Sequence, residues 1–167
     1  FKDEHTDYDS VMRFIERLQK FDLTVTDAGN VHLYKNDKIH LGLPGRDEAI
    51  EAYNNFNRIL GKAGIRIGYM TWEPNQVLTT AFKVSEHTSG GIGRVVDIKE
   101  MEKRPYTHGR LYTKDEMWEN FKYFLDRALP VCEEADIRIA LHPNDPPVDC
   151  LVGISNLITS AEDYKHA

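Results

Sequence analysis

Residues 137–147 read Ile-Arg-Ile-Ala-Leu-His-Pro-Asn-Asp-Pro-Pro, and they give the clearest indication of the fold class. Its first five residues, Ile137–Leu141, have the β-branched and apolar character of a buried strand. The prolines that follow stiffen the chain and remove backbone donors, so the strand must end in a rigid turn that begins at His142. The sequence therefore predicts a strand whose carboxyl end carries polar side chains.

A long amphipathic helix is predicted directly before this strand, over Lys114 to Ala135. Thr113 and Glu116 form a capping box, in which the hydroxyl and the carboxylate satisfy exposed amides at the helix start. Pro130 lies inside the pattern and predicts a kink or a break. One face of the helix is apolar and contains Trp118, Phe121, Phe124, Leu125, Ala128, Leu129 and Cys132.

The same alternation of helix and strand extends toward the N-terminus. We expect a helix over Ser10–Phe21, a short strand over Leu23–Thr26, a polar loop, a helix over Arg46–Ala63 and a buried strand over Ile65–Met70. Helices that alternate with short strands favour parallel pairing with right-handed crossovers. The fold class is therefore α/β, either part of a (β/α)8 TIM barrel or an open doubly wound sheet.

The segment between the second strand and the long helix, about residues 71–113, departs from this rhythm. Loops of this length are uncommon and often functional. In a barrel it would lie at the face where the strands end, which is where active sites are found. At 167 residues the chain is shorter than a complete barrel of about 250 residues. We therefore expect one incomplete barrel domain over residues 1–167, truncated near its C-terminus.

Composition excludes several classes of protein. The chain is 41% hydrophobic and 29% charged, with a net charge of −6 and no basic patch, so nucleic acid is not an expected partner. There is no apolar run of membrane-spanning length and no visible signal peptide, so the cytoplasm is the expected location. Cys132 and Cys150 have neither disulfide nor metal-ligand spacing.

His142 is the strongest candidate for a functional residue, because it directly follows a predicted strand of a parallel sheet. A neutral imidazole there can bind Mn²⁺, Zn²⁺ or Fe²⁺, and Asp145 can orient it or meet substrate hydroxyls. The alternative is a solvated loop histidine. Four other histidines are expected to be solvated in polar loops: His32, His40, His87 and His108.

Two further features are candidates for substrate binding. The stretch Thr88–Arg94 contains three glycines, so its backbone amides and the Arg94 guanidinium could bind a carboxylate; a flexible surface loop is the alternative. Trp72 and Tyr69, near the end of the second strand, could stack on a sugar, although aromatic residues at strand ends are often core.

Several segments, in the same order and over nearly the whole chain, resemble the mannonate dehydratase family. The most specific is Ala140–Pro147 with its His-Pro-Asn-Asp-Pro-Pro run. The others are Leu43–Glu48, Tyr53–Asn55, Leu60–Ile65, Glu119–Phe121 and Gly153–Ile154. The sequence departs from the family at Asn144, where an aspartate is usual, and at Thr79–Thr80 and Ser89–Gly91, where arginine-containing elements are usual.

The resemblance implies a xylose-isomerase-like barrel and a divalent metal, usually Mn²⁺, with Fe²⁺ or Co²⁺ as alternatives. It implies a hydro-lyase that converts D-mannonate to 2-keto-3-deoxygluconate in glucuronate catabolism. His142 would be one metal ligand, and the others would lie in the later half of such proteins. The 167-residue fragment is therefore expected to be inactive alone.

Dehydration of a sugar acid needs a base for the C2 proton and an acid for the departing C3 hydroxyl. The sequence identifies neither group. Two alternatives stay open: a sugar isomerase or epimerase on the same barrel, and a non-catalytic remnant that binds a sugar acid. A homo-oligomer is a further option, because an open half-barrel exposes strand edges and apolar faces.

Overall fold

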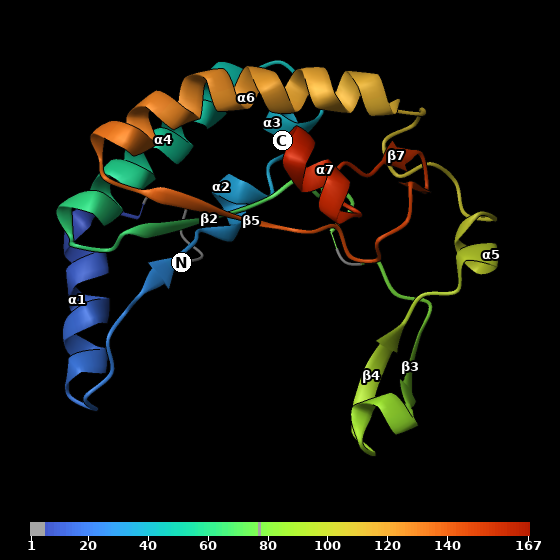
Figure 1. Cartoon of the computed structure of the whole chain (residues 1–167), viewed down its shortest axis with the longest axis horizontal. Helices are drawn as coiled ribbons and strands as arrows, with labels where there is room; N and C mark the ends of the chain where they lie inside the picture. The colour runs from blue at the N-terminus through green and yellow to red at the C-terminus, as the bar shows by residue number, and fades with distance from the viewer. Residues whose placement is uncertain (1–5, 77) are drawn as a thin grey trace.

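Three parallel strands form the sheet that carries the predicted site. The computed structural model describes residues 6–76 and 78–167. Strands β1 (Asp27–Ala28), β2 (Ile67–Thr71) and β5 (Arg138–His142) lie in the order β1-β2-β5, and both pairings are parallel (Figure 1). Because the pairings are parallel, the carboxyl ends of β2 and β5 meet at one edge. The predicted parallel α/β arrangement is confirmed.

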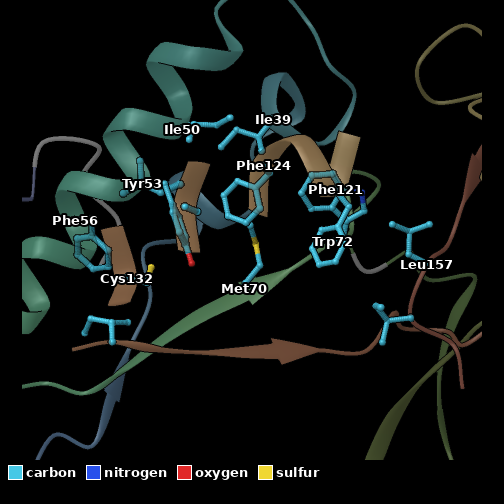
Figure 2. Packing of buried hydrophobic residues seen from close by; sticks show 14 of the residues in the cluster. Ile39, Ile50, Tyr53, Phe56, Met70, Trp72, Phe121, Phe124, Cys132 and Leu157 are labelled. Carbon is cyan, nitrogen blue, oxygen red and sulfur yellow. The ribbon is translucent and has the colours of Figure 1, made fainter. Parts of the chain in front are cut away.

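Two long helices cover one face of this sheet. Helix α4 spans Arg46–Lys62 and helix α6 spans Lys114–Glu134, each within one residue of the predicted bounds. They approach each other closely at Gly61, where an added Cβ would lie 2.3 Å from the carbonyl oxygen of Ala135. Figure 2 shows the core between helices and sheet, which includes Ile39, Ile50, Tyr53, Phe56, Met70, Trp72, Phe121, Phe124 and Cys132.

The opposite face of the sheet is more open, and strand periodicity explains why. Met70 is fully buried against the helices, whereas its neighbour Tyr69 faces the other way and is only half-buried. On β5, Arg138, Ala140 and His142 are exposed along the same open face. The polar end of β5 is therefore accessible from the side that the helices leave uncovered.

We expected a kink or a break at Pro130; helix α6 continues through Pro130, so there is no break. Pro130 cannot donate to the carbonyl of Asp126, but both residues are exposed, so water can satisfy that carbonyl. At the helix start the Thr113 hydroxyl accepts from the amide of Glu116 at 3.3 Å. The Glu116 carboxylate binds Arg110 instead of completing the capping box.

The N-terminal part differs most from prediction. Helix α1 spans Tyr8–Gln19, but the strand expected over Leu23–Thr26 is absent; β1 begins at Asp27 instead, because only residues 27 and 28 align with β2. The predicted polar loop contains two four-residue helices, α2 (Val31–Tyr34) and α3 (Asp37–His40). His40 was expected to be solvated, and this prediction is wrong: the side chain is 0% exposed.

The long segment after β2 contains an antiparallel hairpin of β3 (Ala81–Val84) and β4 (Ile92–Val95), linked by a 3₁₀ turn at Glu86–Thr88. The hairpin projects away from the sheet (Figure 1). Helix α5 (Ile98–Met101) follows and contributes Met101 to a small second core with Leu151 and Val152.

The chain ends in short elements: β6 (Cys150–Leu151), β7 (Ile154–Ser155) and α7 (Ala161–His166). The β6–β7 pair is antiparallel, and it precedes a buried stretch that runs to Ile158. None of the helices in residues 6–76 and 78–167 combines the length and the apolarity needed to cross a bilayer.

Candidate functional site

His142 lies where the sequence places it, at the carboxyl end of a parallel strand. It is the last residue of β5 and pairs in register with Thr71, the last residue of β2. Its Nδ1 lies 2.6 Å from the carbonyl oxygen of Pro143. Since a carbonyl can only accept, Nδ1 carries the proton, and the neutral ring has its lone pair on Nε2. The side chain is exposed, so that lone pair can reach a ligand.

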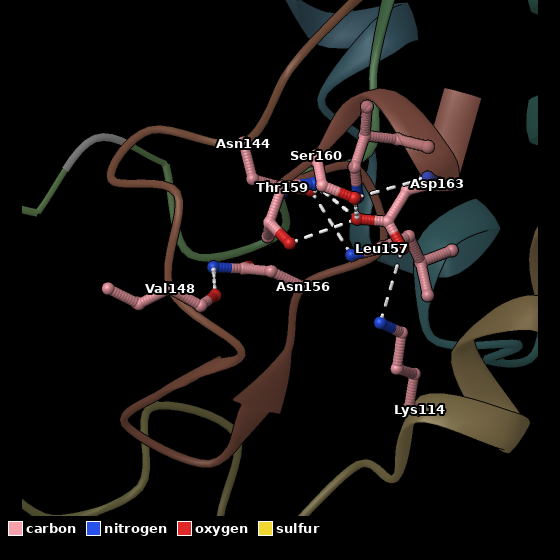
Figure 3. A network of polar contacts seen from close by, with 9 residues as sticks. Lys114, Asn144, Val148, Asn156, Leu157, Thr159, Ser160 and Asp163 are labelled. Atoms are coloured by element: carbon pink, nitrogen blue, oxygen red, sulfur yellow. Dashed lines mark hydrogen bonds and ion pairs between the residues drawn. The ribbon is translucent and has the colours of Figure 1, made fainter. Parts of the chain in front are cut away.

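The turn after His142 is fixed by Asn144, which is only 3% exposed. Its Nδ2 donates to the carbonyl of Trp72 at 2.8 Å, and its Oδ1 accepts from the amides of Leu157 at 3.2 Å and Ile158 at 2.8 Å. Figure 3 shows Asn144 beside this later segment. An ionised aspartate could accept the two amide bonds but could not donate to Trp72. The amide at this position therefore fits its surroundings.

The later segment has its own anchor in Asp163. Its carboxylate accepts from the amide and hydroxyl of Thr159, both at 3.0 Å, and from the Ser160 hydroxyl at 2.8 Å. Lys114, at the start of α6, forms an ion pair with it at 3.3 Å (Figure 3). These bonds hold the pKa of the Asp163 carboxyl well below its ordinary value. The strand-end turn thus packs against a segment that is itself firmly held.

Asp145 is exposed, and its backbone amide donates to Glu73 Oε1 at 3.1 Å. Glu73 follows β2 and is 5% exposed; its other oxygen binds Lys35 Nζ at 2.8 Å. Neither Glu73 nor Lys35 was identified from the sequence. Lys35 is 38 residues before Glu73, so no local spacing links the two charges.

Trp72 does not form the expected stacking surface. It is 1% exposed and packs against His40, with ring centroids 4.5 Å apart, and against Phe121, at 4.9 Å. Figure 2 shows its ring inside the core. The cause is strand periodicity: side chains alternate between the two faces of a strand, so Trp72, two residues after the buried Met70, points to the same face.

Tyr69 is the aromatic residue that faces the open side. Its ring centroid lies 4.7 Å from that of Tyr34 and 5.9 Å from that of His142. Burial first, then the neighbouring Tyr34 and Glu73, raise the pKa of Tyr69 above its ordinary value. The phenol is therefore neutral at physiological pH and can donate a hydrogen bond beside His142.

Arg94 is not brought to this site. It lies on β4, exposed and opposite Phe82, in the hairpin that projects away from the sheet (Figure 1). The Thr88–Gly91 stretch forms the hairpin turn, with the Gly91 amide donating to the carbonyl of Thr88 at 2.8 Å. The expected carboxylate site therefore does not combine with His142 in this structure.

The side chains at the end of β5 supply part of a possible site for a divalent metal ion. His142 suits one coordination position, because its Nδ1–H is fixed and its Nε2 is exposed. No group of three or more His, Cys, Asp or Glu side chains that could hold an ion occurs within residues 6–76 and 78–167. The described residues therefore offer one fitting ligand and not a complete site.

Comparisons with known proteins agree on one family. The family model for D-mannonate dehydratase (UxuA) matches residues 96–167. Mannonate dehydratase of Thermotoga maritima is 30% identical, with 95% of this chain and 52% of the relative covered. The Endomicrobium trichonymphae enzyme is also 30% identical, over 87% and 47%. The chain thus spans about half the length of the curated relatives it matches.

A solved structure has the same fold over this region. The crystal structure of mannonate dehydratase from Streptococcus suis serotype 2 superimposes with a TM-score of 0.76 and 23% sequence identity. The match covers 96% of this chain and 47% of that chain. The mixed α/β arrangement of the present chain therefore corresponds to about half of a mannonate dehydratase fold.

Proposed function

Because this chain is a relative of the mannonate dehydratases along most of its length, we propose that it supplies about half of a metal-dependent hydro-lyase that dehydrates D-mannonate to 2-keto-3-deoxygluconate. The reaction eliminates water from a small sugar acid, as in glucuronate catabolism. The expected location is the cytoplasm, and no nucleic acid or membrane takes part.

The fold we propose for the whole protein is a xylose-isomerase-like (β/α)8 barrel, of which this chain is a single incomplete domain. Three observations support it: the strand order β1-β2-β5 follows the chain, both pairings are parallel, and α4 and α6 lie on the same face. In a barrel the uncovered face would be the interior, and the ends of β2 and β5 would form part of the active-site rim.

The functional proposal rests on the position and the tautomer of His142. The imidazole ends a parallel strand, its Nδ1–H is fixed by the Pro143 carbonyl, and its exposed Nε2 can bind a metal. When bound, a divalent ion, Mn²⁺ first and Fe²⁺ or Co²⁺ as alternatives, would act as a Lewis acid toward the negative charge that develops on the sugar carboxylate.

The surrounding residues bind and orient the sugar acid. Asp145 lies three residues beyond His142 with an exposed carboxylate, which can accept hydrogen bonds from sugar hydroxyls. Tyr69 presents a neutral phenol on the same open face and can donate one. No described residue is assigned as the base for the C2 proton or as the acid for the C3 hydroxyl.

The proposal is tested on the full-length protein that contains this chain, with the chain alone assayed in parallel. Each is incubated with D-mannonate and Mn²⁺, with EDTA as the control, and 2-keto-3-deoxygluconate is measured. We expect product only from the full-length protein and only with metal. His142→Ala should weaken Mn²⁺ binding by about 100-fold or more, whereas His87→Ala, an exposed histidine of the hairpin turn, should not.

The product distinguishes the alternatives. A product with the same mass as the substrate would indicate an isomerase or epimerase on the same barrel. Tight binding of the sugar acid without turnover, with or without metal, would indicate a non-catalytic binding protein. Either result would refute the dehydratase proposal.

A further inference from the structure

A poorly exposed ion pair lies beside the ends of β2 and β5. Lys35 Nζ lies 2.8 Å from Glu73 Oε2, and the two side chains are 15% and 7% exposed. Lys35 directly follows α2, and Glu73 lies two residues beyond β2. Among the ion pairs of residues 6–76 and 78–167, this is the only one in which both partners are so poorly exposed.

The pair reaches the His142 turn through its second oxygen. Glu73 Oε1 accepts the backbone amide of Asp145 at 3.1 Å. One carboxylate therefore joins the end of α2, the end of β2 and the turn after β5. The two contacts engage both carboxylate oxygens, and the Glu73 side chain is only 7% exposed, so it is held within the protein.

Burying two charges is costly, and an apolar pair of similar volume is often equally stable. A buried ion pair makes structural sense where it specifies one geometry. Here the specified geometry is that of the Asp145 backbone, whose other side is held by Asn144 and its bonds to Trp72 and Ile158. The turn is thus fixed from two directions by charged and polar groups.

We infer that Glu73, anchored by Lys35, is a positioning residue that fixes the turn carrying His142 and Asp145. The inference rests on the proposed function, because it assigns the pair a task in presenting the two residues that face metal and sugar acid. Active-site groups must be held within about 0.5 Å of their working positions, which requires such supporting contacts.

The test is hydrogen exchange and imidazole ¹⁵N NMR on the ¹⁵N-labelled full-length protein that contains this chain. Glu73→Ala should accelerate exchange of the Asp145 amide by about tenfold or more, because a charge-assisted hydrogen bond is lost. It should also lower the fraction of the His142 Nδ1–H tautomer. Glu73→Gln should restore both readouts only in part, since its one side-chain carbonyl oxygen can accept from Asp145 but its NH₂ group cannot accept from Lys35. Glu51→Ala, at the exposed pair with Arg58, is the matched control and should change neither.

Exchange of core amides in α4 and α6 separates a local effect from loss of the fold. If Glu73→Ala also exposes those amides, Lys35→Met decides, because it removes only the anchor of Glu73. Unchanged Asp145 exchange in a folded Glu73→Ala or Lys35→Met protein would overturn the inference. An Asp145 effect equally large in Glu51→Ala would do the same.

Adding Mn²⁺ alone separates this inference from the proposed function. Paramagnetic broadening of the His142 imidazole by Mn²⁺ in the unmodified full-length protein, weakened in Glu73→Ala, supports both. Faster Asp145 exchange without any Mn²⁺ effect at His142 in that protein supports the positioning role and contradicts the metal role of His142. Mn²⁺ broadening that is identical in all variants, with unchanged Asp145 exchange, leaves the proposed function standing and refutes the positioning role.

Discussion

The buried histidine His40 makes the stability of the fold depend on pH. Its ring is 0% exposed and lies against Trp72, and neither ring nitrogen has a hydrogen-bond partner among the described residues. Burial is the main cause that lowers the pKa of His40, from 6.5 to about 3. The nearby backbone of Tyr34 acts in the opposite direction and raises this pKa, whereas the positive charge of Lys35 lowers it further. The folded protein therefore keeps this imidazole neutral at pH values where the unfolded chain protonates it.

The sign and the size of the effect follow from this difference. Between pH 6.5 and about 3 the unfolded state binds more protons, so the free energy of unfolding falls as the pH falls through this range. The loss is about 1.4 kcal/mol per pH unit below 6.5, so lowering the pH from about 7.5 to about 5.5 should remove roughly 1.4 kcal/mol through His40 alone. In His40→Leu this contribution is absent.

The assay is urea unfolding at about pH 7.5 and about pH 5.5, followed by tryptophan fluorescence. The comparison is between the unmodified protein, His40→Leu and His87→Leu, whose histidine is exposed in the folded state. His87→Leu should lose stability with falling pH as the unmodified protein does, and His40→Leu should lose about 1.4 kcal/mol less. Equal losses in all three proteins would refute the reasoning.

Two further substitutions test the polar turn and the helix contact. Asn144→Ala leaves the Trp72 carbonyl and two buried amides without partners, so the free energy of unfolding measured in urea should fall by about 2–4 kcal/mol. In the control Asn55→Ala, on the exposed side of α4, the free energy of unfolding should change by no more than about 0.5 kcal/mol. Gly61→Ala places a Cβ 2.3 Å from the Ala135 carbonyl oxygen and should cost about 1–3 kcal/mol in thermal unfolding. An unchanged melting temperature in Gly61→Ala would show that the helices separate easily.

The long helices could be predicted because their signals are local. Helix α4 has an apolar stripe with helical spacing and ends before Gly64, whose φ of 84° suits glycine. Helix α6 begins after Thr113, whose hydroxyl caps it. The short helices α2 and α3 were missed although their caps are visible in the sequence: the side chains of Asn30 and Asn36 accept amide bonds at their starts.

The first strand could not be placed from its own residues. Leu23–Thr26 has the apolar and β-branched composition of a strand, but the chain pairs with β2 only at Asp27 and Ala28. Pairing depends on where β2 lies in space, which no local pattern encodes. The family resemblance is confirmed by the comparisons, whereas the partial (β/α)8 barrel and the metal remain predictions.

The candidate site was predictable in part. His142 lies at the strand end as expected, because a strand followed by prolines has few ways to end. Trp72 could have been placed in the core by counting, since it shares the parity of Met70. The Lys35–Glu73 pair could not be found, because its two charges come together only when separate elements pack.

The β3–β4 hairpin is suited to serve as an insertion point for labels. The backbone hydrogen bonds of the hairpin join its own residues, from the Thr80–Val95 contact at its base to the Ser85–Gly91 turn at its tip. The hairpin projects from the sheet (Figure 1). At its tip, Gly90 has open space around it, with nothing within 4 Å of an added Cβ. A short peptide tag or a fluorophore attached there would report on the protein from outside while leaving β2, β5 and the His142 turn untouched.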